Sequence, residues 1–219
     1  MRCVCSIMPE FARAVLEALR QPMEAGTISV ARANVHATYP ARFQLVAAMN
    51  PCRCGYLDDP GLACPRAPRC AADYQSRLSG PLLDRVDIHL DVPPVSVEDM
   101  ALPPPREGTA EIAARVHAAR LVQSQRFADA GAPALRTNCE ADGELLERIA
   151  PLDPAAAALL RRASEQLRLS ARGYHRTLRV ARTIADLDGA DLIRKPHLAE
   201  AVAFRRARPL VHHQQSQRR

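Results

Sequence analysis

Tryptophan is absent, and aromatic residues make up only 4% of the 219 residues. This scarcity argues against a platform that stacks the bases of single-stranded nucleic acid. No apolar run approaches the roughly 18 residues that a membrane helix needs. With 47% apolar and 25% charged residues, the composition indicates a soluble globular chain. Its length allows one large domain or two small ones and excludes a peptide hormone or a disulfide miniprotein.

Lysine is almost absent as well, since Lys195 is the only one among 30 basic residues. The net charge is +6, and the rest of the positive charge is carried by arginine. Arginine presents a planar fork of donors that suits phosphate groups, so the balance is compatible with phosphate partners. A GC-rich coding sequence would also explain the excess of arginine over lysine. Net charge alone is therefore weak evidence for binding to nucleic acid.

The first residues lack the basic, then apolar, then small-residue order of a signal peptide. Seven cysteines are an odd number, which does not suit a complete disulfide framework. We therefore expect a reducing, cytoplasmic compartment. In such a compartment clustered cysteines are metal ligands or idle thiols rather than disulfides.

Apolar periodicity divides the chain into a mixed first half and a helical second half. The first half contains a helix over residues 10–20, which Pro22 and Gly26 end, and a strand over 27–30 with a turn over 31–36. A second strand is expected over 42–49, where a continuous apolar run is typical of a strand buried on both faces. A loop over 52–70 and an alternating strand over 86–92 follow. The second half begins after a proline-rich linker over 93–110. Its expected helices span 111–128, 143–149, 154–167, 171–187 and 196–206, before a flexible tail over 209–219.

Two polar residues stand out at the borders of the expected strands. Asn50 follows the strand over 42–49, where it either begins a turn with Pro51 or presents an amide at the carboxyl edge of a parallel sheet, the usual ligand edge. Arg85 lies between Asp84 and Asp87, either in a surface salt-bridge cluster or as an arginine that stabilises charge on a transferring phosphoryl group.

Four cysteines fall within nineteen residues of the expected loop. Zn²⁺ takes four tetrahedral ligands from short loops of this kind. The first pair has one intervening residue where two are more usual, so free thiols remain an equally open interpretation. The four residues are Cys52, Cys54, Cys64 and Cys70.

Several longer sequence segments resemble one protein family. The segments 9–24, 43–55, 77–89, 169–176 and 180–187 are similar, in order, to the Mg-chelatase-like AAA+ ATPases of the ComM/YifB competence-protein group. The resemblance covers about residues 9–208. It implies an α/β fold, a partial P-loop AAA+ core with an incomplete parallel sheet, followed by an all-helical lid over 111–208. It also implies a ring, usually hexameric, that uses ATP and Mg²⁺ at subunit interfaces and acts on DNA during branch migration.

The resemblance also assigns roles to single residues. Asn50 matches the sensor 1 asparagine, and Arg85 matches the arginine finger that reaches a neighbouring subunit's nucleotide. Arg172 matches the sensor 2 arginine, for which Arg176, one turn further along the same helix face, is a substitute candidate.

The sequence departs from this family at its start. The phosphate-binding pattern G-x-x-x-x-G-K-[ST] is absent, and residues 5–8 stand where the family has the acidic pair of its Walker B strand. We therefore expect residues 1–8 to be unrelated to the family, the core over 9–92 to be a remnant, and its sheet to expose edges. Without these groups the chain alone should not hydrolyse ATP.

Two other functions remain open. One is a motor subunit of magnesium chelatase, which would share the same ATPase machinery. The other is a non-catalytic fragment that binds DNA or a partner ring.

Overall fold

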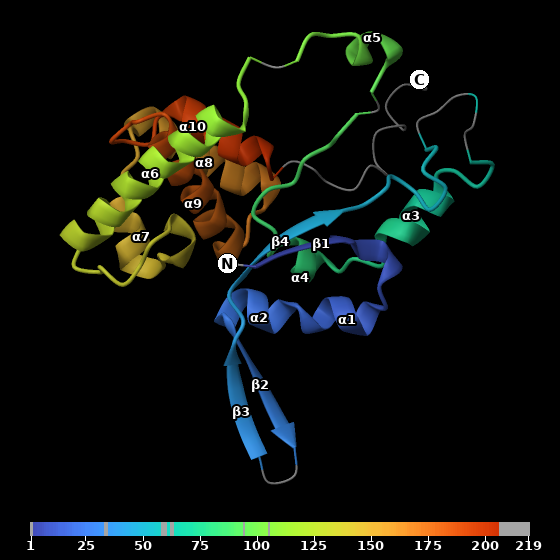
Figure 1. Cartoon of the computed structure of the whole chain (residues 1–219), viewed down its shortest axis with the longest axis horizontal. Helices are drawn as coiled ribbons and strands as arrows, with labels where there is room; N and C mark the ends of the chain where they lie inside the picture. Colours follow the sequence, from blue (N-terminus) through green and yellow to red (C-terminus); the bar gives the residue numbers. More distant parts are fainter. Residues whose placement is uncertain are drawn as a thin grey trace. The chain divides into compact units, whose positions relative to one another are not determined.

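The computed structural model describes residues 2–32, 35–57, 61, 64–93, 95–104 and 106–205. The expected tail over 209–219 lies outside these residues. The chain divides into two compact units, one within residues 1–86 and the other within residues 87–207. The first is mixed α/β and the second is helical (Figure 1).

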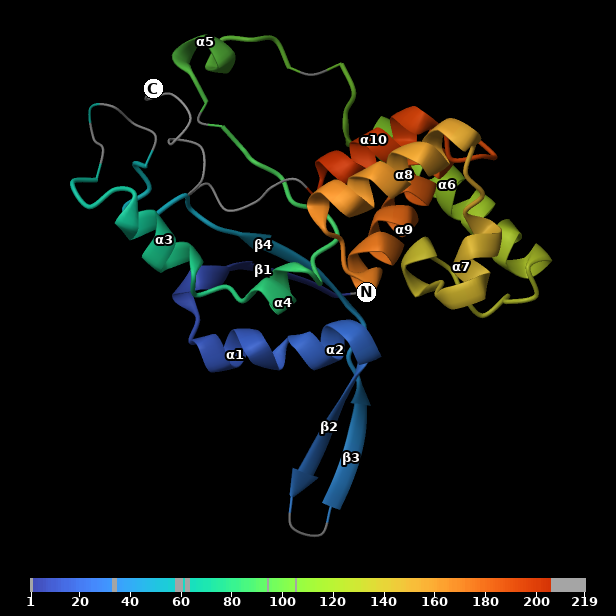
Figure 2. The same ribbon diagram turned by 180° about the vertical axis from the view of Figure 1, so that it is seen from behind.

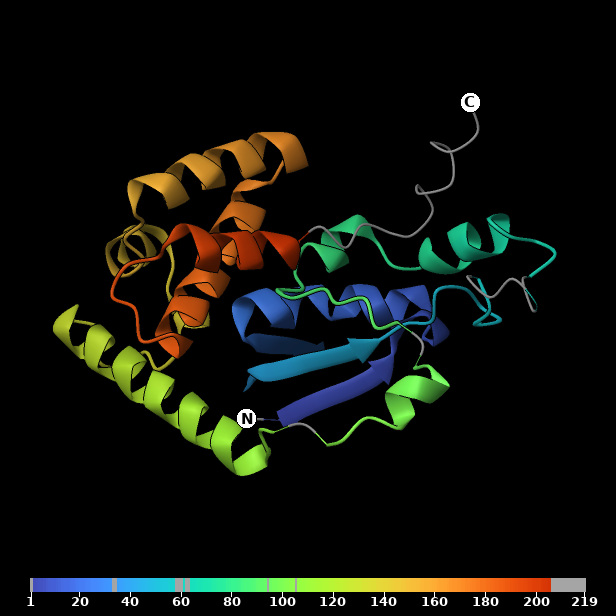
Figure 3. The same ribbon diagram turned by 90° about the horizontal axis from the view of Figure 1, so that it is seen from above.

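The first unit contains a two-stranded parallel sheet. Strand β1 (Arg2–Ile7) pairs with β4 (Phe43–Ala48) in a register that joins Arg2 to Phe43 and Ile7 to Ala48. Figure 3 shows the two arrows side by side and pointing the same way. The strand expected from residues 42–49 is thus confirmed.

The expected burial of β4 on both faces is wrong. Its side chains are half-buried or exposed, and Val46 is 45% exposed. Within the described residues β4 pairs only with β1, and only one face meets a small apolar cluster. That cluster consists of the buried residues Met8, Leu16, Leu78 and Leu82, with Leu45 of β4 packed against it.

The first helical segment is broken rather than continuous. A 3₁₀ turn (η1, Met8–Glu10) precedes α1 (Arg13–Ala18) and α2 (Arg20–Ala25). The break falls at Leu19, and Pro22 does not end the helix as expected. Pro22 occupies the first turn of α2, where its missing N–H has no intrahelical acceptor to lose. Gly26 does end the helix, in the left-handed conformation at φ 63°.

A β-hairpin extends from the end of α2 (Figure 1). Strands β2 (Thr27–Arg32) and β3 (Val35–Pro40) are antiparallel, and the hydroxyls of Ser29 and Thr38 lie 3.1 Å apart across them. The expected strand over 27–30 is confirmed, while residues 33 and 34 of the expected turn lie outside the described residues. The strands are longer than the alternation indicated, so that both enter the segment assigned to the turn.

Two short helices complete the first unit. They are α3 (Arg69–Gln75) and α4 (Gly80–Leu83), and the hydroxyl of Ser79 caps α4 by accepting from the Leu82 amide. Between β4 and α3 the described residues form no helix or strand, as expected for a loop, but residues 69 and 70 of the expected loop belong to α3.

The strand expected over residues 86–92 is wrong. This segment forms no regular secondary structure and belongs to no sheet in the described part of the chain. The amide of His89 donates to the carbonyl of Phe204 at 3.1 Å instead of to a strand. Its apolar side chains are exposed, Leu90 by 69% and Val92 by 87%. Alternation without a partner strand or a covered face does not make a strand.

The second unit is built from helices, as predicted (Figure 2). Three expected helices have the bounds that the sequence indicated, because Asp142, Asp153 and Ser170 cap them with their side chains. The elements are α5 (Val97–Met100), α6 (Thr109–Asp129), η2 (Asn138–Glu140), α7 (Gly143–Ile149), α8 (Pro154–Leu167), α9 (Ala171–Leu187) and α10 (Lys195–Ala203).

The second unit has the larger core. It contains fifteen buried apolar residues, among them Phe127, Leu146, Leu160 and Leu198. Helices α6, α8, α9 and α10 contribute most of them. Within the described residues, no helix combines the length and apolarity needed to cross a bilayer.

Candidate functional site

Asn50 lies just beyond the carboxyl end of β4, the position predicted for it. Its side chain is exposed, while its backbone hydrogen-bonds the hydroxyl of Tyr74 on α3. Tyr74 is buried, and this burial together with the nearby charge of Glu10 raises the pKa of its phenol. The exposed side chain of Asn50 therefore extends from a backbone that the buried Tyr74 holds in place.

Arg85 is neither exposed nor part of a surface salt-bridge cluster. Its side chain is only 7% exposed, and its guanidinium donates to Glu24 Oε2 at 2.7 Å and to the Pro81 carbonyl at 2.5 Å. Glu24 lies 61 residues away, on α2. The aspartates beside Arg85 in the sequence are not the partners of this ion pair. Arg85 Nε is buried and has no hydrogen-bond partner among the described residues.

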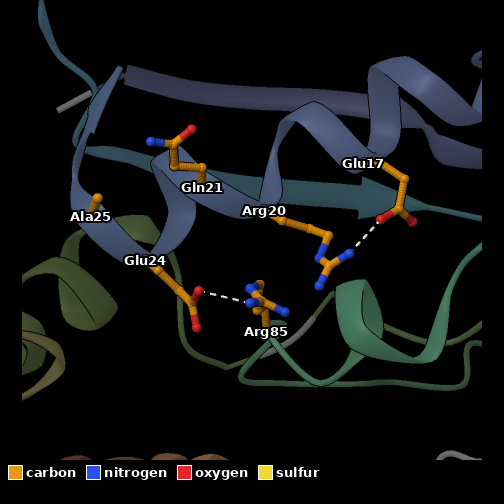
Figure 4. Close-up of a pocket in the computed structure, with 6 residues that line it drawn as sticks. All are labelled: Glu17, Arg20, Gln21, Glu24, Ala25 and Arg85. Atoms are coloured by element: carbon orange, nitrogen blue, oxygen red, sulfur yellow. Dashed lines mark hydrogen bonds and ion pairs between the residues drawn. The ribbon is translucent and has the colours of Figure 1, made fainter. Parts of the chain in front are cut away.

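A pocket of about 410 Å³ opens beside this ion pair. Figure 4 shows two ion pairs facing the same space, Glu17 with Arg20 at 2.7 Å and Glu24 with Arg85. A hydrogen bond with the Ser79 side chain, and a second with Arg20, lower the pKa of the Glu17 carboxyl. Two carboxylates thus balance two guanidiniums, and a phosphate would have to displace a carboxylate to bind here. The lining residues are Glu17, Arg20, Gln21, Glu24, Ala25 and Arg85, and do not include Asn50.

The sensor 2 candidates belong to the other unit, on α9, and the structure separates their environments. Arg172 lies exposed in the first turn of α9, next to the Ser170 cap. Arg176, one turn later, is buried, and its guanidinium donates to Asp87 Oδ1 at 2.5 Å. Of the two candidates, Arg172 is the accessible one.

Two further arginines of the helical unit, Arg126 and Arg182, form ion pairs with a buried aspartate. Arg182 is fully buried, and burial lowers the pKa of its guanidinium. It bonds Asp186, which also accepts from Arg126, from Gln123 at 3.0 Å and from Asn138 at 2.8 Å. The i, i+4 spacing of Arg182 and Asp186 allows this ion pair but carries no signal of its burial.

Three of the four predicted cysteine ligands converge, two from the loop before α3 and one, Cys70, from the first turn of α3. The sulfur atoms of Cys52, Cys54 and Cys70 lie within 4.8 Å of one another. Those of Cys52 and Cys54 are 3.1 Å apart. Hydrogen bonding with the Cys52 thiol, then with the Tyr56 backbone, lowers the pKa of Cys54 to about 7. Burial raises the pKa of Cys52. Cys64 is half-buried and interacts with the thiols of Cys54 and Cys70.

Comparison with known proteins places the chain in a family. The family model for magnesium chelatase, subunit ChlI, matches residues 5–100, and the model for its C-terminal region matches residues 106–205. The chain is 42% identical over 199 residues to Competence protein ComM of Haemophilus influenzae, covering 90% of this chain and 37% of that protein.

Two uncharacterized relatives give the same result. YifB of Escherichia coli is 39% identical over 217 residues, with 95% of this chain and 40% of that protein covered. A protein of Mycobacterium tuberculosis is 41% identical over 196 residues, with 90% and 38% covered. The chain therefore spans about two fifths of the length of these relatives. It belongs to the magnesium chelatase-like family that includes ComM and YifB.

Proposed function

We propose that the chain is the sensor-bearing part of a ring-forming AAA+ ATPase that remodels DNA. The observation that carries this proposal is the position of Asn50 beyond the carboxyl end of β4, parallel to β1, within the region that the chelatase model matches. Open α/β sheets bind their ligands at this edge. In a hexameric ring Asn50 would act as sensor 1, Arg85 as the finger toward a neighbouring subunit, and Arg172 as sensor 2.

The residues present do not fit a complete site for ATP and Mg²⁺. Mg²⁺ prefers carboxylate oxygens, but β1 ends at Ile7 and is followed by Met8 and Pro9. The nearest acid in sequence, Glu10, interacts with Tyr74. The only lysine, Lys195, begins α10 and lies in no glycine-rich loop.

We therefore expect no ATP hydrolysis by the purified chain. The measurement is phosphate release with and without DNA, with the Haemophilus ComM protein as the comparison. Sensor and finger residues supply charge to a nucleotide that other groups must already hold. Turnover at the rate of an ordinary AAA+ protein would contradict this part of the proposal.

DNA binding is proposed for the helical unit. Four of its arginines are exposed on or beside α8 and α9, whereas Arg176 and Arg182 are buried in ion pairs. The exposed set is Arg161, Arg162, Arg168 and Arg172.

A titration against a four-way DNA junction tests this surface. Affinity should fall steeply with salt, because binding of arginine to phosphate releases counterions. Replacing both Arg161 and Arg162 with glutamine should lower the salt slope by about 1 for each arginine that binds a phosphate. Arg115→Gln, which removes an exposed arginine paired with Glu107, is the matched control. Equal binding by all three proteins would argue against this surface.

A chelatase motor subunit is the alternative that the description of both family models favours. Such a subunit would not require DNA. An absence of junction binding at low salt by the unmodified chain would favour it over the DNA-remodelling proposal.

A further inference from the structure

Three cysteines of the loop between β4 and α3, together with Cys70 in the first turn of α3, supply the four ligands that a structural zinc takes. A tetrahedral Zn²⁺ with Zn–S bonds of about 2.3 Å needs sulfur atoms about 3.8 Å apart. Cys52, Cys54 and Cys70 already lie within 4.8 Å of one another, and the Cys54 thiol also interacts with that of Cys64. Three of the four sulfurs therefore already lie near the distances of a zinc site, and the fourth, that of Cys64, interacts with two of them.

Apolar burial does not explain why these thiols meet. Cys52 is fully buried, but Cys54 is exposed and Cys64 and Cys70 are only half-buried. None of the four belongs to the apolar cluster of the first unit. A buried cysteine that acts as a small apolar residue packs among aliphatic side chains, whereas these pack against one another.

A hydrogen-bonded backbone turn begins at one cysteine in each half of the loop. The amide of Gly55 donates to the Cys52 carbonyl at 3.1 Å, and the amide of Ala67 donates to the Cys64 carbonyl at 2.8 Å. Each turn therefore begins at a cysteine. Gly55 adopts φ 84°, a conformation that a residue with a side chain rarely accepts, directly after Cys54.

Charge around the loop suits a zinc tetrathiolate. Four thiolates and one Zn²⁺ carry a net charge of −2. Three exposed arginines lie next to the ligands in the sequence or two residues away, namely Arg53, Arg66 and Arg69. Their positive charge favours the deprotonated thiols that zinc requires.

We propose that Cys52, Cys54, Cys64 and Cys70 bind one structural Zn²⁺ that joins the first turn of α3 to the segment after β4. The metal has no open coordination position, so its role is to hold the loop. From the same helix the Gln75 amide donates to the Pro51 carbonyl at 3.0 Å, and Tyr74 hydrogen-bonds the Asn50 backbone. By holding α3, the zinc site would thus fix the backbone at Asn50. It does not depend on the function proposed above.

The test is the metal content of the full chain purified without chelator. We expect about one equivalent of zinc, and a loss of about tenfold or more in Cys54→Ser. Cys139→Ser is the matched control, because Cys139 is an exposed thiol of the helical unit outside the cluster. Less than a tenth of an equivalent in the unmodified chain, or equal zinc in the two variants, would overturn the proposal.

A cobalt titration keeps the test decisive if Cys54→Ser does not fold. The unmodified chain is stripped of metal under reducing conditions and titrated with Co²⁺. The intense visible bands of tetrahedral cobalt thiolate should saturate at one equivalent and disappear on adding Zn²⁺. A weak octahedral spectrum, or no saturable binding, would show that the thiols do not form the site.

Discussion

At the scale of single residues, the helical unit depends on one buried carboxylate. Asp186 is 4% exposed and forms ion pairs with both Arg126 and the fully buried Arg182. The Asp186→Asn substitution keeps the shape of the side chain but leaves the guanidinium of Arg182 buried without its negatively charged partner. Losses of this kind cost about 3–5 kcal/mol. We expect the urea midpoint of the helical unit to fall by about 1 M or more.

Urea unfolding followed by circular dichroism measures this change. The control is Glu107→Gln, which removes the partner of Arg115 in a pair whose side chains are both about half-exposed. Such pairs contribute less than about 1 kcal/mol. A midpoint for Asp186→Asn within the range of the control would contradict the assigned role of the network.

A second residue-scale prediction concerns the ion pair that covers Arg85. Glu24→Gln removes the charged partner of this guanidinium, so Arg85 should leave its buried position more often. Its modification by phenylglyoxal, followed by peptide mass spectrometry, should become severalfold faster. Glu17→Gln is the matched control, because Glu17 pairs with Arg20 across the same pocket. If both variants leave Arg85 equally protected, Glu24 does not hold it.

The same ion pair shows where sequence reasoning stops at this scale. The residues around Arg85 indicated aspartate partners or a finger, and the family resemblance favoured the finger. The partner on α2 is 61 residues away and carries no local signal. The clustering of the cysteines was accessible to prediction because it follows from their short spacing in the sequence, whereas a single long-range ion pair leaves no such signal.

At the scale of elements, α3 should depend on the metal. If zinc joins Cys70 to the loop after β4, removing it frees the first turn of a seven-residue helix. Short helices have little stability of their own. Hydrogen exchange in residues 50–57 and 69–75 should therefore accelerate on metal removal and slow again when zinc is returned. Exchange in α8 serves as the internal control, and equal acceleration there would indicate general unfolding instead.

Element boundaries were predictable where a side chain marks them. Helices α7, α8 and α9 begin after Asp142, Asp153 and Ser170, residue types that cap helices, and their bounds match the prediction. The strand expected over 86–92 had only alternation in its favour, and a strand needs a partner that no local pattern supplies. For the same reason the length of β4 was predicted but its exposure was not.

At the scale of the whole molecule, the two units differ in the size of their cores. The described part of the first unit has a cluster of four buried apolar residues, while the second has fifteen. Because apolar burial is the main favourable term in folding, we expect the first unit to unfold at lower urea concentration. Hydrogen exchange followed by mass spectrometry across a urea series separates the two. A single shared transition would contradict this expectation.

The burial of Arg176 and Arg182 has a consequence for mutational scanning of this family's helical region. Both guanidiniums bond acids within their own unit, so lysine cannot reproduce their planar contacts and even this mild substitution should reduce the yield of folded protein. Arg172 on the same helix is exposed and should tolerate lysine. A scan that measures the abundance of each variant would therefore separate the two arginines that hold the helix in place from the exposed Arg172.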